Sequence, residues 1–142
     1  MIPIVPALAL AAAPFGPLCR GAGLEAAVAH YADIARAMDP RRTAALYMAD
    51  GVLVGPEGAP ITGPVEIEAF LAGFGGYKLG EQKMTIEWIK PAAARGVFHT
   101  EGLYSQRGND PKGAAFAVSG RFQADWRCTR AGWRVVRMHA GQ

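Results

Sequence analysis

The chain has 142 residues, of which 51% are hydrophobic and 19% charged, and its formal net charge is +3. This length favours one domain, and the composition excludes a disordered tail or a charged coiled coil. The charge is mildly basic, but no motif that reads nucleic acid accompanies it, so we expect no nucleic-acid partner.

Residues 1–23 are predicted to be a signal peptide followed by a linker. Ile2 to Ala13 form an apolar run of signal-peptide length that ends in small residues suited to cleavage. No Lys or Arg precedes the run and prolines interrupt it, so an apolar extension is the alternative. The run is too short to span a bilayer. We therefore expect a periplasmic or secreted protein, with the cytoplasm as the alternative, and a single folded domain over residues 24–142.

Cys19 and Cys128 are the two cysteines of the chain. In an oxidising compartment they could pair and close a long loop, which would add a few kcal/mol of stability. The sequence does not show whether their Cα atoms come within reach, and Cys128 could instead be a small buried hydrophobic residue. Neither position has the spacing of a metal site.

Three helices are predicted in the first half of the chain. Apolar residues recur at helical spacing from Leu24 to Met38. Asp39 and Pro40 give an N-cap and a first-turn proline, so a second, short helix is expected from Pro40 to about Met48. Pro64 opens a third helix, and glycines from Gly73 onward end it.

Strands dominate the second half. Val52–Val54 is predicted as a short strand, and from Gln82 onward apolar residues alternate with polar ones, as expected for strands with one buried face. Helices followed by long antiparallel strands indicate an α+β fold with the helices on one face. A curved sheet of this kind, wrapped by the three helices, is expected to enclose a pocket at its open end.

The order of elements resembles the cone-shaped fold of the nuclear-transport-factor-2-like superfamily, in its SnoaL-like and ketosteroid-isomerase-like branch. The run YADIARAMDPRRTAALYMADGVLVGPEGAPITGPVEIEAF (31–70) and the closing hairpin SGRFQADWRCTRAGWRVVRMH (119–139) carry the resemblance, which covers residues from about 24 to 140. It implies a fold far more than an activity, because function belongs to sites rather than to folds.

The isomerases supply residue-by-residue expectations. Tyr31 matches a tyrosine on the first helix that helps hold the substrate oxyanion, and Tyr47 matches a second tyrosine, on the second helix. The general base of the family precedes a proline, and Gly55 occupies that position here. The family's protonated aspartate matches Ala124 or, with a one-residue slip, Asp125, which should face away from the pocket. The resemblance therefore implies no ketosteroid isomerase activity, because that reaction needs the base.

The last predicted strand offers polar candidates for the pocket. Trp133, Val135, Arg137 and His139 are expected to share one face, which starts apolar and ends in a cation and an imidazole. With Tyr31, Arg137 and His139 could hold a carboxylate or another small oxyanion. The alternative is that both lie in solvent at the strand end.

The full set of predicted ligand contacts joins these polar groups to aromatic residues that the sheet should aim at the pocket: Tyr31, Tyr47, Tyr104, Phe122, Trp126, Arg137 and His139. Aromatic residues are more often core than ligand platform, and a cone lets them serve as both. His99 and Glu101 should be external, at a dimer contact, and two ligands do not make a metal site. No cofactor or metal is expected.

Three functions are compatible with the sequence. The first is a small-molecule-binding domain for a small organic or anionic ligand, forming a homodimer through its sheet. The second is an enzyme of the isomerase, lyase, cyclase or hydrolase kind that uses Tyr31, Arg137 and His139. The third is a structural or dimerisation module that uses the outer face of the sheet. No motif for a nucleophile, a phosphate loop or a dinucleotide site is present.

Overall fold

The computed structural model describes Cys19 and residues 23–141. Three α-helices, one 3₁₀ turn and six strands make up these residues. In chain order they are α2 (Gly23–Arg36), α3 (Pro40–Ala44), β1 (Tyr47–Val54), η1 (Pro56–Gly58), β2 (Pro60–Thr62), α4 (Pro64–Ala72), β3 (Lys78–Pro91), β4 (Val97–Asn109), β5 (Ala115–Thr129) and β6 (Gly132–Gly141). The predicted α+β class is confirmed.

Helix α3 begins where the sequence indicated but ends earlier. Asp39 caps it, because one of its carboxylate oxygens accepts a hydrogen bond from the Arg42 backbone N–H at 3.0 Å. The helix was expected to reach Met48, but it ends at Ala44. The backbone N–H of Val135 on β6 donates to the carbonyl of Leu46 at 2.8 Å, so pairing with β6 extends the chain from this point. Tyr47 therefore starts a strand rather than lying on a helix.

The six strands form one mixed sheet in the order β2-β1-β6-β5-β4-β3. All neighbouring pairs are antiparallel except β1 and β6, which are parallel. The expected short strand at Val52–Val54 is the end of the eight-residue β1, and the edge strand β2 has no counterpart among the predicted elements. The last strand thus lies in the interior of the sheet, between β1 and β5.

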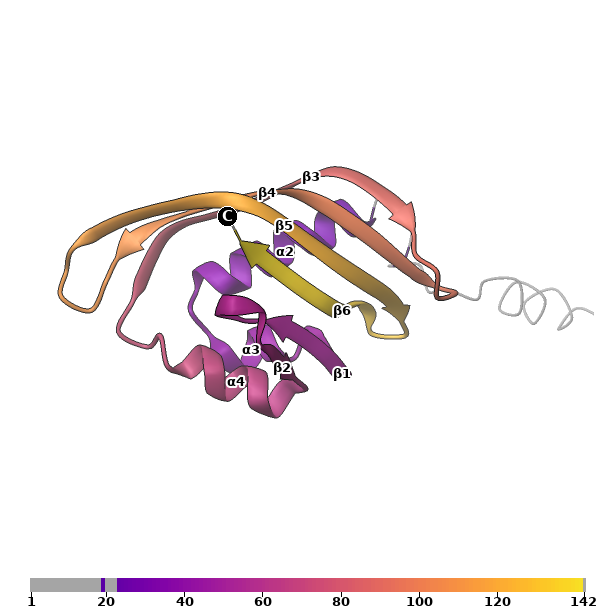
Figure 1. The fold of residues 1–142 in the computed structure, drawn as a ribbon, viewed down its shortest axis with the longest axis horizontal. Coiled ribbons are helices and arrows are strands. Elements are labelled where there is room, and N and C mark those ends of the chain that lie inside the picture. The colour runs from indigo at the N-terminus through magenta and orange to yellow at the C-terminus, as the bar shows by residue number, and fades with distance from the viewer. Residues whose placement is uncertain (1–18, 20–22, 142) are drawn as a thin grey trace, which may run out of the picture.

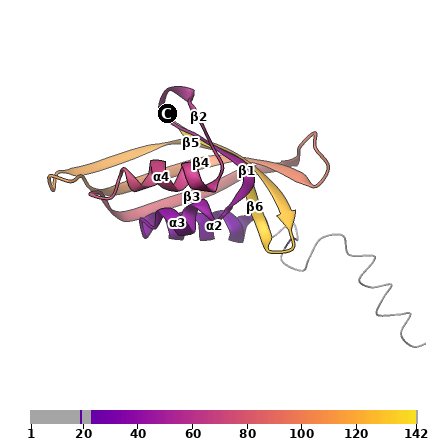
Figure 2. The same ribbon diagram turned by 90° about the horizontal axis from the view of Figure 1, so that it is seen from below.

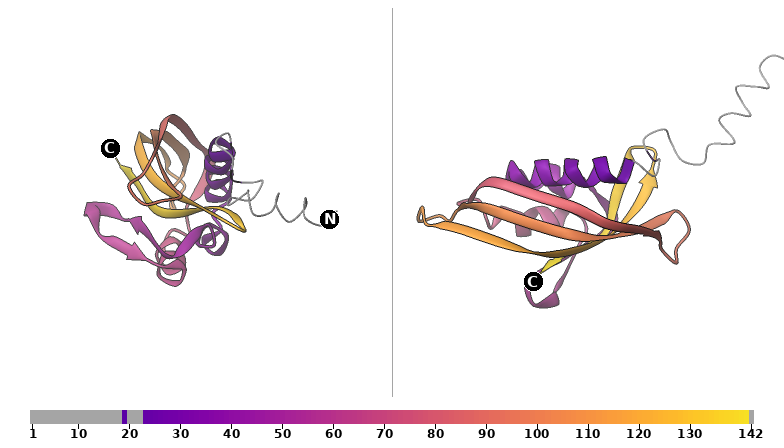
Figure 3. Two further views of the ribbon diagram at one scale, coloured as in Figure 1. Left: turned by 90° about the vertical axis from the view of Figure 1, so that its right-hand side faces the viewer. Right: turned by 90° about the horizontal axis from the view of Figure 1, so that it is seen from above.

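The sheet arches over the helices, so that it has a concave face toward them and an outer face away from them (Figures 1 and 2). Side chains of the deep concave face are closed off from solvent: Phe122 and Thr100 are 0% exposed and Trp126 1%. Phe122 and Trp126 pack with Leu24, Val28 and Tyr31 of α2 in one hydrophobic core. The β4–β5 hairpin extends beyond the helices at one end of the molecule (Figure 3).

The sheet has several register shifts, and two of them, both β-bulges, change which face the residues named in the sequence analysis occupy. On β6, Arg137 pairs with Asp125 whereas Val135 pairs with Trp126, so Val136 is an extra residue. On β3, Ile86 pairs with Gly102 whereas Trp88 pairs with Glu101, so an extra residue precedes Trp88. Because side chains alternate along a strand, one extra residue reverses the face of everything beyond it.

A disulfide joins Cys19 to Cys128 at the end of β5, with a Cα–Cα distance of 5.6 Å and a sequence separation of 109. The chain thus makes the bond that the sequence left open. The predicted leader and linker lie outside the described residues, apart from Cys19 and Gly23. Within the part of the chain that is described, no helix is long and apolar enough to cross a membrane.

Candidate functional site

Two buried tyrosines form the polar centre of the concave face. Tyr31 on α2 and Tyr47 at the start of β1 place their hydroxyl oxygens 2.7 Å apart. The Tyr31 ring also packs edge-on against Tyr47 and Trp126. Burial raises the pKa of Tyr31 to about 12, although its hydrogen bond to Tyr47 acts in the other direction. Burial likewise raises the pKa of Tyr47, with the neighbouring Tyr31 adding to it.

Both phenols are neutral at physiological pH, and the raised pKa values keep them neutral in alkaline solution as well. In such a pair one hydroxyl donates a hydrogen bond to the other. The proton of the accepting hydroxyl stays available for a second hydrogen bond. Among the described residues, neither hydroxyl has a further hydrogen-bond partner. The pair can therefore give one hydrogen bond to an acceptor, as an oxyanion-type donor does, but it cannot serve as a base.

A chain of hydrogen bonds closes the deep end of the concave face. The indole N–H of Trp126 donates to the Thr100 hydroxyl at 3.0 Å, and that hydroxyl donates to the Ala124 carbonyl at 3.0 Å. All three residues are buried. Trp126 and Phe122, which were expected to contact a ligand as well as to fill the core, are thus fully enclosed by protein.

Nearer the hairpin the same face is half-buried instead of closed. Tyr104 lies across Gly120 of β5: a Cβ added there would meet the Tyr104 ring at 3.1 Å. Met84 on β3 faces the same side, since it pairs with Tyr104 and packs against the core. Phe116 and Val118 continue this apolar strip along β5. We call these four residues, Tyr104, Met84, Phe116 and Val118, the concave strip.

Arg137 and His139 do not join this surface. The expectation that they share a face with Trp133 and Val135 is wrong, because the bulge at Val136 lies between the two pairs. Trp133 and Val135 are buried, whereas Arg137 and His139 are exposed on the outer face, in register with Asp125 and Gln123. The structure therefore does not bring either side chain to Tyr31.

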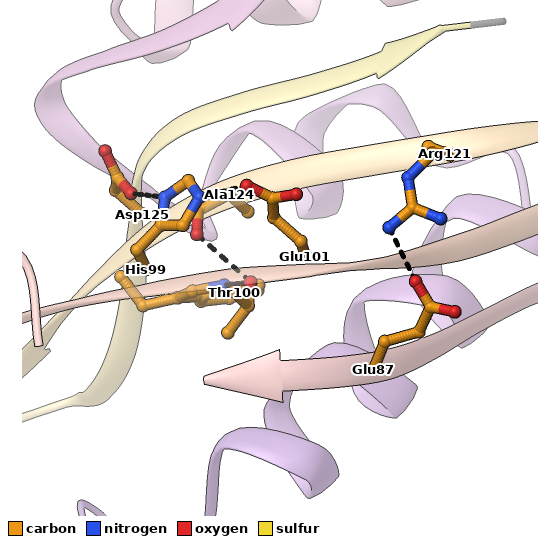
Figure 4. Close-up of polar contacts among 8 residues, drawn as sticks. Glu87, His99, Thr100, Glu101, Arg121, Ala124 and Asp125 are labelled. Atoms are coloured by element: carbon orange, nitrogen blue, oxygen red, sulfur yellow. Dashed lines mark hydrogen bonds and ion pairs between the residues drawn. The ribbon is translucent and has the colours of Figure 1, made fainter. Parts of the chain in front are cut away.

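The outer face carries a histidine held between two carboxylates (Figure 4). The Nδ1 of His99 lies 2.5 Å from Oδ1 of Asp125, and its Nε2 lies 2.9 Å from Oε2 of Glu101. Partial burial lowers the pKa of His99, but hydrogen bonds and charge from both carboxylates outweigh this, and the net pKa is raised. His99 and Glu101 are external, as predicted, and Asp125 faces away from the concave side, also as predicted.

Aromatic and charged side chains surround this histidine. The Trp88 ring lies 5.4 Å from the His99 ring, and the Lys90 ammonium lies 5.0 Å from the Trp88 ring centre. Beside them Arg121 pairs with Glu87 (Figure 4). The alternation that starts at Gln82 would put Trp88 on the same buried face as Met84, but the bulge between Ile86 and Trp88 turns it outward and leaves it 38% exposed.

The outer face is hollowed in two places. One depression of about 510 Å³ lies toward the hairpin, beside Arg107 and Ala117, and another of about 430 Å³ lies beside Leu103 and Arg121. Both are wide and shallow. Within the described part of the chain, no group of three or more His, Cys, Asp or Glu side chains is arranged to hold a metal ion.

The positions that match the catalytic carboxylates of the isomerases are Gly55 and Ala124 or Asp125, and none of them places a carboxylate on the concave side. Gly55 is buried before the 3₁₀ turn η1 and offers no side chain. Ala124 faces the concave side but has only a methyl group, and Asp125 is bonded to His99 on the other face. The two tyrosines that match the oxyanion donors of the isomerases are therefore present. The positions that match the general base and the second acid offer no carboxylate on the concave side.

Comparison with known proteins agrees with this architecture. The ketosteroid isomerase-like protein from Erwinia carotovora is similar in structure, with a TM-score of 0.71 and 19% identity over 88% of this chain and 95% of that one. Aln2 from a Streptomyces species gives a TM-score of 0.61 and 17% identity, over 78% and 81% of the two chains. A nuclear-transport-factor-2-like protein with a cystatin-like fold, from Novosphingobium aromaticivorans, gives a TM-score of 0.58 and 18% identity, over 82% of this chain and 77% of that one.

These identities are low, so the three likenesses show the fold alone. No curated protein sequence matches the chain. The family model for the SnoaL-like domain, however, matches residues 22–139. Members of this family bind small molecules or are enzymes. Because the match covers all the helices and nearly all of the sheet, the chain belongs to the SnoaL-like domain family.

Proposed function

We propose that this protein binds a small organic molecule on the concave face of its sheet, against the concave strip. The observation that carries the proposal is the change in burial along that face. The deep end is sealed by Trp126 and Phe122, whereas Tyr104 and Met84 are half-buried although they are apolar and face the helices. Small-molecule sites are typically concave and mostly apolar, with few polar groups that fix orientation.

The tyrosine pair supports this assignment from the inner end. Tyr31 and Tyr47 belong to the core against which Tyr104 and Met84 pack. Their spare proton suits a carbonyl or another acceptor on the ligand, because a neutral buried donor pairs with an acceptor without burying a charge. The anion contact expected from Arg137 and His139 has no place in this proposal, since both are exposed on the outer face.

The test compares two adjacent residues that face opposite ways. A panel of ring-containing compounds is screened by thermal shift, and the affinity of any stabilising compound is measured by titration. Tyr104→Ala should weaken its binding at least several-fold, because it removes a large part of the concave strip. Leu103→Ala, one residue away on the outer face, should leave the affinity unchanged. Equal affinities for both variants and the unmodified protein would overturn the site.

We further propose that the protein is exported to an oxidising compartment. The Cys19–Cys128 disulfide supports this, because such bonds persist outside the reducing cytosol. Mass spectrometry of the protein from its native host should find a terminus after the apolar run and a mass that corresponds to the oxidised cysteines. A protein that keeps Met1 would contradict a cleaved leader.

A homodimer through the outer face is the corresponding proposal for assembly. The support is the exposure of Trp88 and Leu103 on that face, at 38% and 46%, amid charges of both signs. Light scattering after gel filtration should give twice the chain mass, and Leu103→Glu should shift it toward the monomer. A monomer at every concentration would remove this proposal without affecting the concave site.

A further inference from the structure

Four aromatic rings connect α4 to the β4–β5 hairpin at the open end of the concave face. Successive ring centres lie 5.4, 5.7 and 5.9 Å apart, each pair in an edge contact, in the order Phe70, Phe74, Tyr77 and Phe116. Gly76, in the same loop, lies so close to Pro111 at the hairpin tip that a Cβ there would meet the proline ring at 3.0 Å. The four rings, here called the aromatic clasp, therefore join the helix layer to the tip of the sheet.

Gln82 on β3 faces the concave side just behind this clasp. It lies two residues before Met84 on an unbroken stretch of strand, so both side chains point the same way. Its pairing partner on β4 is Gln106, which in turn pairs with Val118 of the concave strip. Two residues further along β4, Gly108 pairs with Phe116, which is one of the four rings of the clasp.

The side-chain oxygen of Gln82 is buried, and no described residue donates a hydrogen bond to it. A buried acceptor left in this state costs free energy, so such groups in folded proteins nearly always have a partner. Among the described residues, the indole N–H of Trp133 is also buried without a hydrogen-bond partner. Trp133 lies opposite Cys128, at the disulfide and far along the sheet from the clasp.

We propose that the amide of Gln82 accepts a hydrogen bond from the bound ligand, and that this ligand is an uncharged ring compound carrying an O–H or N–H donor. This rests on the proposed function. The neighbouring concave residues Gln106, Met84 and Tyr104 have no charge, so an ionic ligand would be desolvated without a counter-charge. The clasp offers ring edges and faces, which favour a flat aromatic partner.

The experiment uses two probes that differ in one hydrogen-bond donor, 2-naphthol and its methyl ether. Their affinities are measured by calorimetry for the unmodified chain, for Gln82→Met and for Lys83→Met, which places the same side chain on the outer face. The unmodified chain and Lys83→Met should prefer naphthol by about 3- to 10-fold, the value of one neutral hydrogen bond. Gln82→Met should bind both probes with similar affinity.

The outcomes separate this inference from the function on which it rests. If both probes bind the unmodified chain but the preference survives in Gln82→Met, the role of Gln82 is wrong and the concave site stands. If neither probe binds up to its solubility limit, the ring-binding function fails and this inference fails with it.

A second measurement needs no ligand. Gln82→Met should raise the melting temperature of the free protein, because it replaces an acceptor without a partner by an apolar side chain. Lys83→Met should not raise it. A fall in the melting temperature of Gln82→Met alone would show that the amide is already satisfied, and would overturn the proposal.

Discussion

The two faces of the sheet satisfy their polar groups by different chemistry, although they alternate along the same strands. On β4, Thr100 of the concave face bonds to Trp126 and to a backbone carbonyl, all without charge. His99 and Glu101, on either side of it, belong to a charged cluster on the outer face. Sensitivity to pH and salt should therefore be concentrated on the outer face, while the concave face keeps neutral chemistry over a wide pH range.

The largest difference between the faces should appear on truncating one side chain from each. Trp126→Ala should destabilise the fold by about 3–5 kcal/mol, because it opens a cavity in a closed core and leaves Thr100 without its donor. Leu103→Ala, from the exposed outer face, should cost less than about 1 kcal/mol. Urea denaturation of both variants measures this, and equal losses would mean that the faces are not packed differently.

Removing the disulfide tests how much the bond between Cys19 and β5 contributes to stability. The double variant Cys19→Ser, Cys128→Ser should lose about 2–4 kcal/mol of unfolding free energy, since the bond closes a long loop. The unmodified protein unfolded under reducing conditions should match it. A double variant as stable as the oxidised protein would show that the fold does not depend on this bond.

The tyrosine pair tests the neutral chemistry of the concave face. Tyr31→Phe should cost about 1–3 kcal/mol, because it leaves the buried Tyr47 hydroxyl without its partner. In the unmodified protein, spectrophotometric titration should show Tyr31 ionising only near pH 12. A stability loss that depended on pH between 5 and 9 would contradict the neutral pair.

The His99 cluster should produce a smaller effect, and one that depends on pH. Both ring nitrogens face carboxylates, and only the protonated imidazole can donate to both. Because the folded-state pKa is raised, the stabilisation is fully present below the unfolded value of about 6.5 and is lost as pH rises through the folded pKa. His99→Gln should thus cost about 1–2 kcal/mol near pH 5.5 and less near pH 8.5.

His139→Gln is the matched control for this measurement. His139 is an exposed histidine on the same outer face, and it has no ion pair among the described residues. Its replacement should change stability little at either pH. A loss in His99→Gln that stayed constant between the two pH values would mean that the imidazole is not held as a cation.

The sequence predicted the helices and the strand content well, because local signals determine both. Asp39 and Pro40 marked the start of α3, and the alternation in β5 placed Phe122 and Trp126 on the buried face. The end of α3 was not predictable from local signals. Helical spacing continues through Tyr47, but pairing with β6, nearly ninety residues later in the chain, takes over from Leu46 onward.

The wrong predictions at the site come mainly from β-bulges, one on β6 and one on β3. A prediction by alternation holds only while the register is unbroken, and one extra residue at Val136 moved Arg137 and His139 to the other face. The bulge on β3 did the same to Trp88. Nothing in the local composition marks either bulge, because each is defined by the strand opposite.

Gln82 was missed for a different reason. Its place in the alternating run with Met84 and Ile86 already put a polar side chain on the face expected to be buried. That was a usable signal, but the cost of burying an amide depends on its partners, and these come from strands distant in the sequence.

The position of the disulfide relative to β6 has a consequence for how the chain can fold. The bond makes residues 19–128 a covalent ring that includes β1 and β5, the two strands on either side of β6. The last strand lies outside this ring, yet it occupies the place between them. The ring can therefore close before β6 joins the sheet, and the sheet stays split into two pieces until the ten residues of β6 insert between β1 and β5.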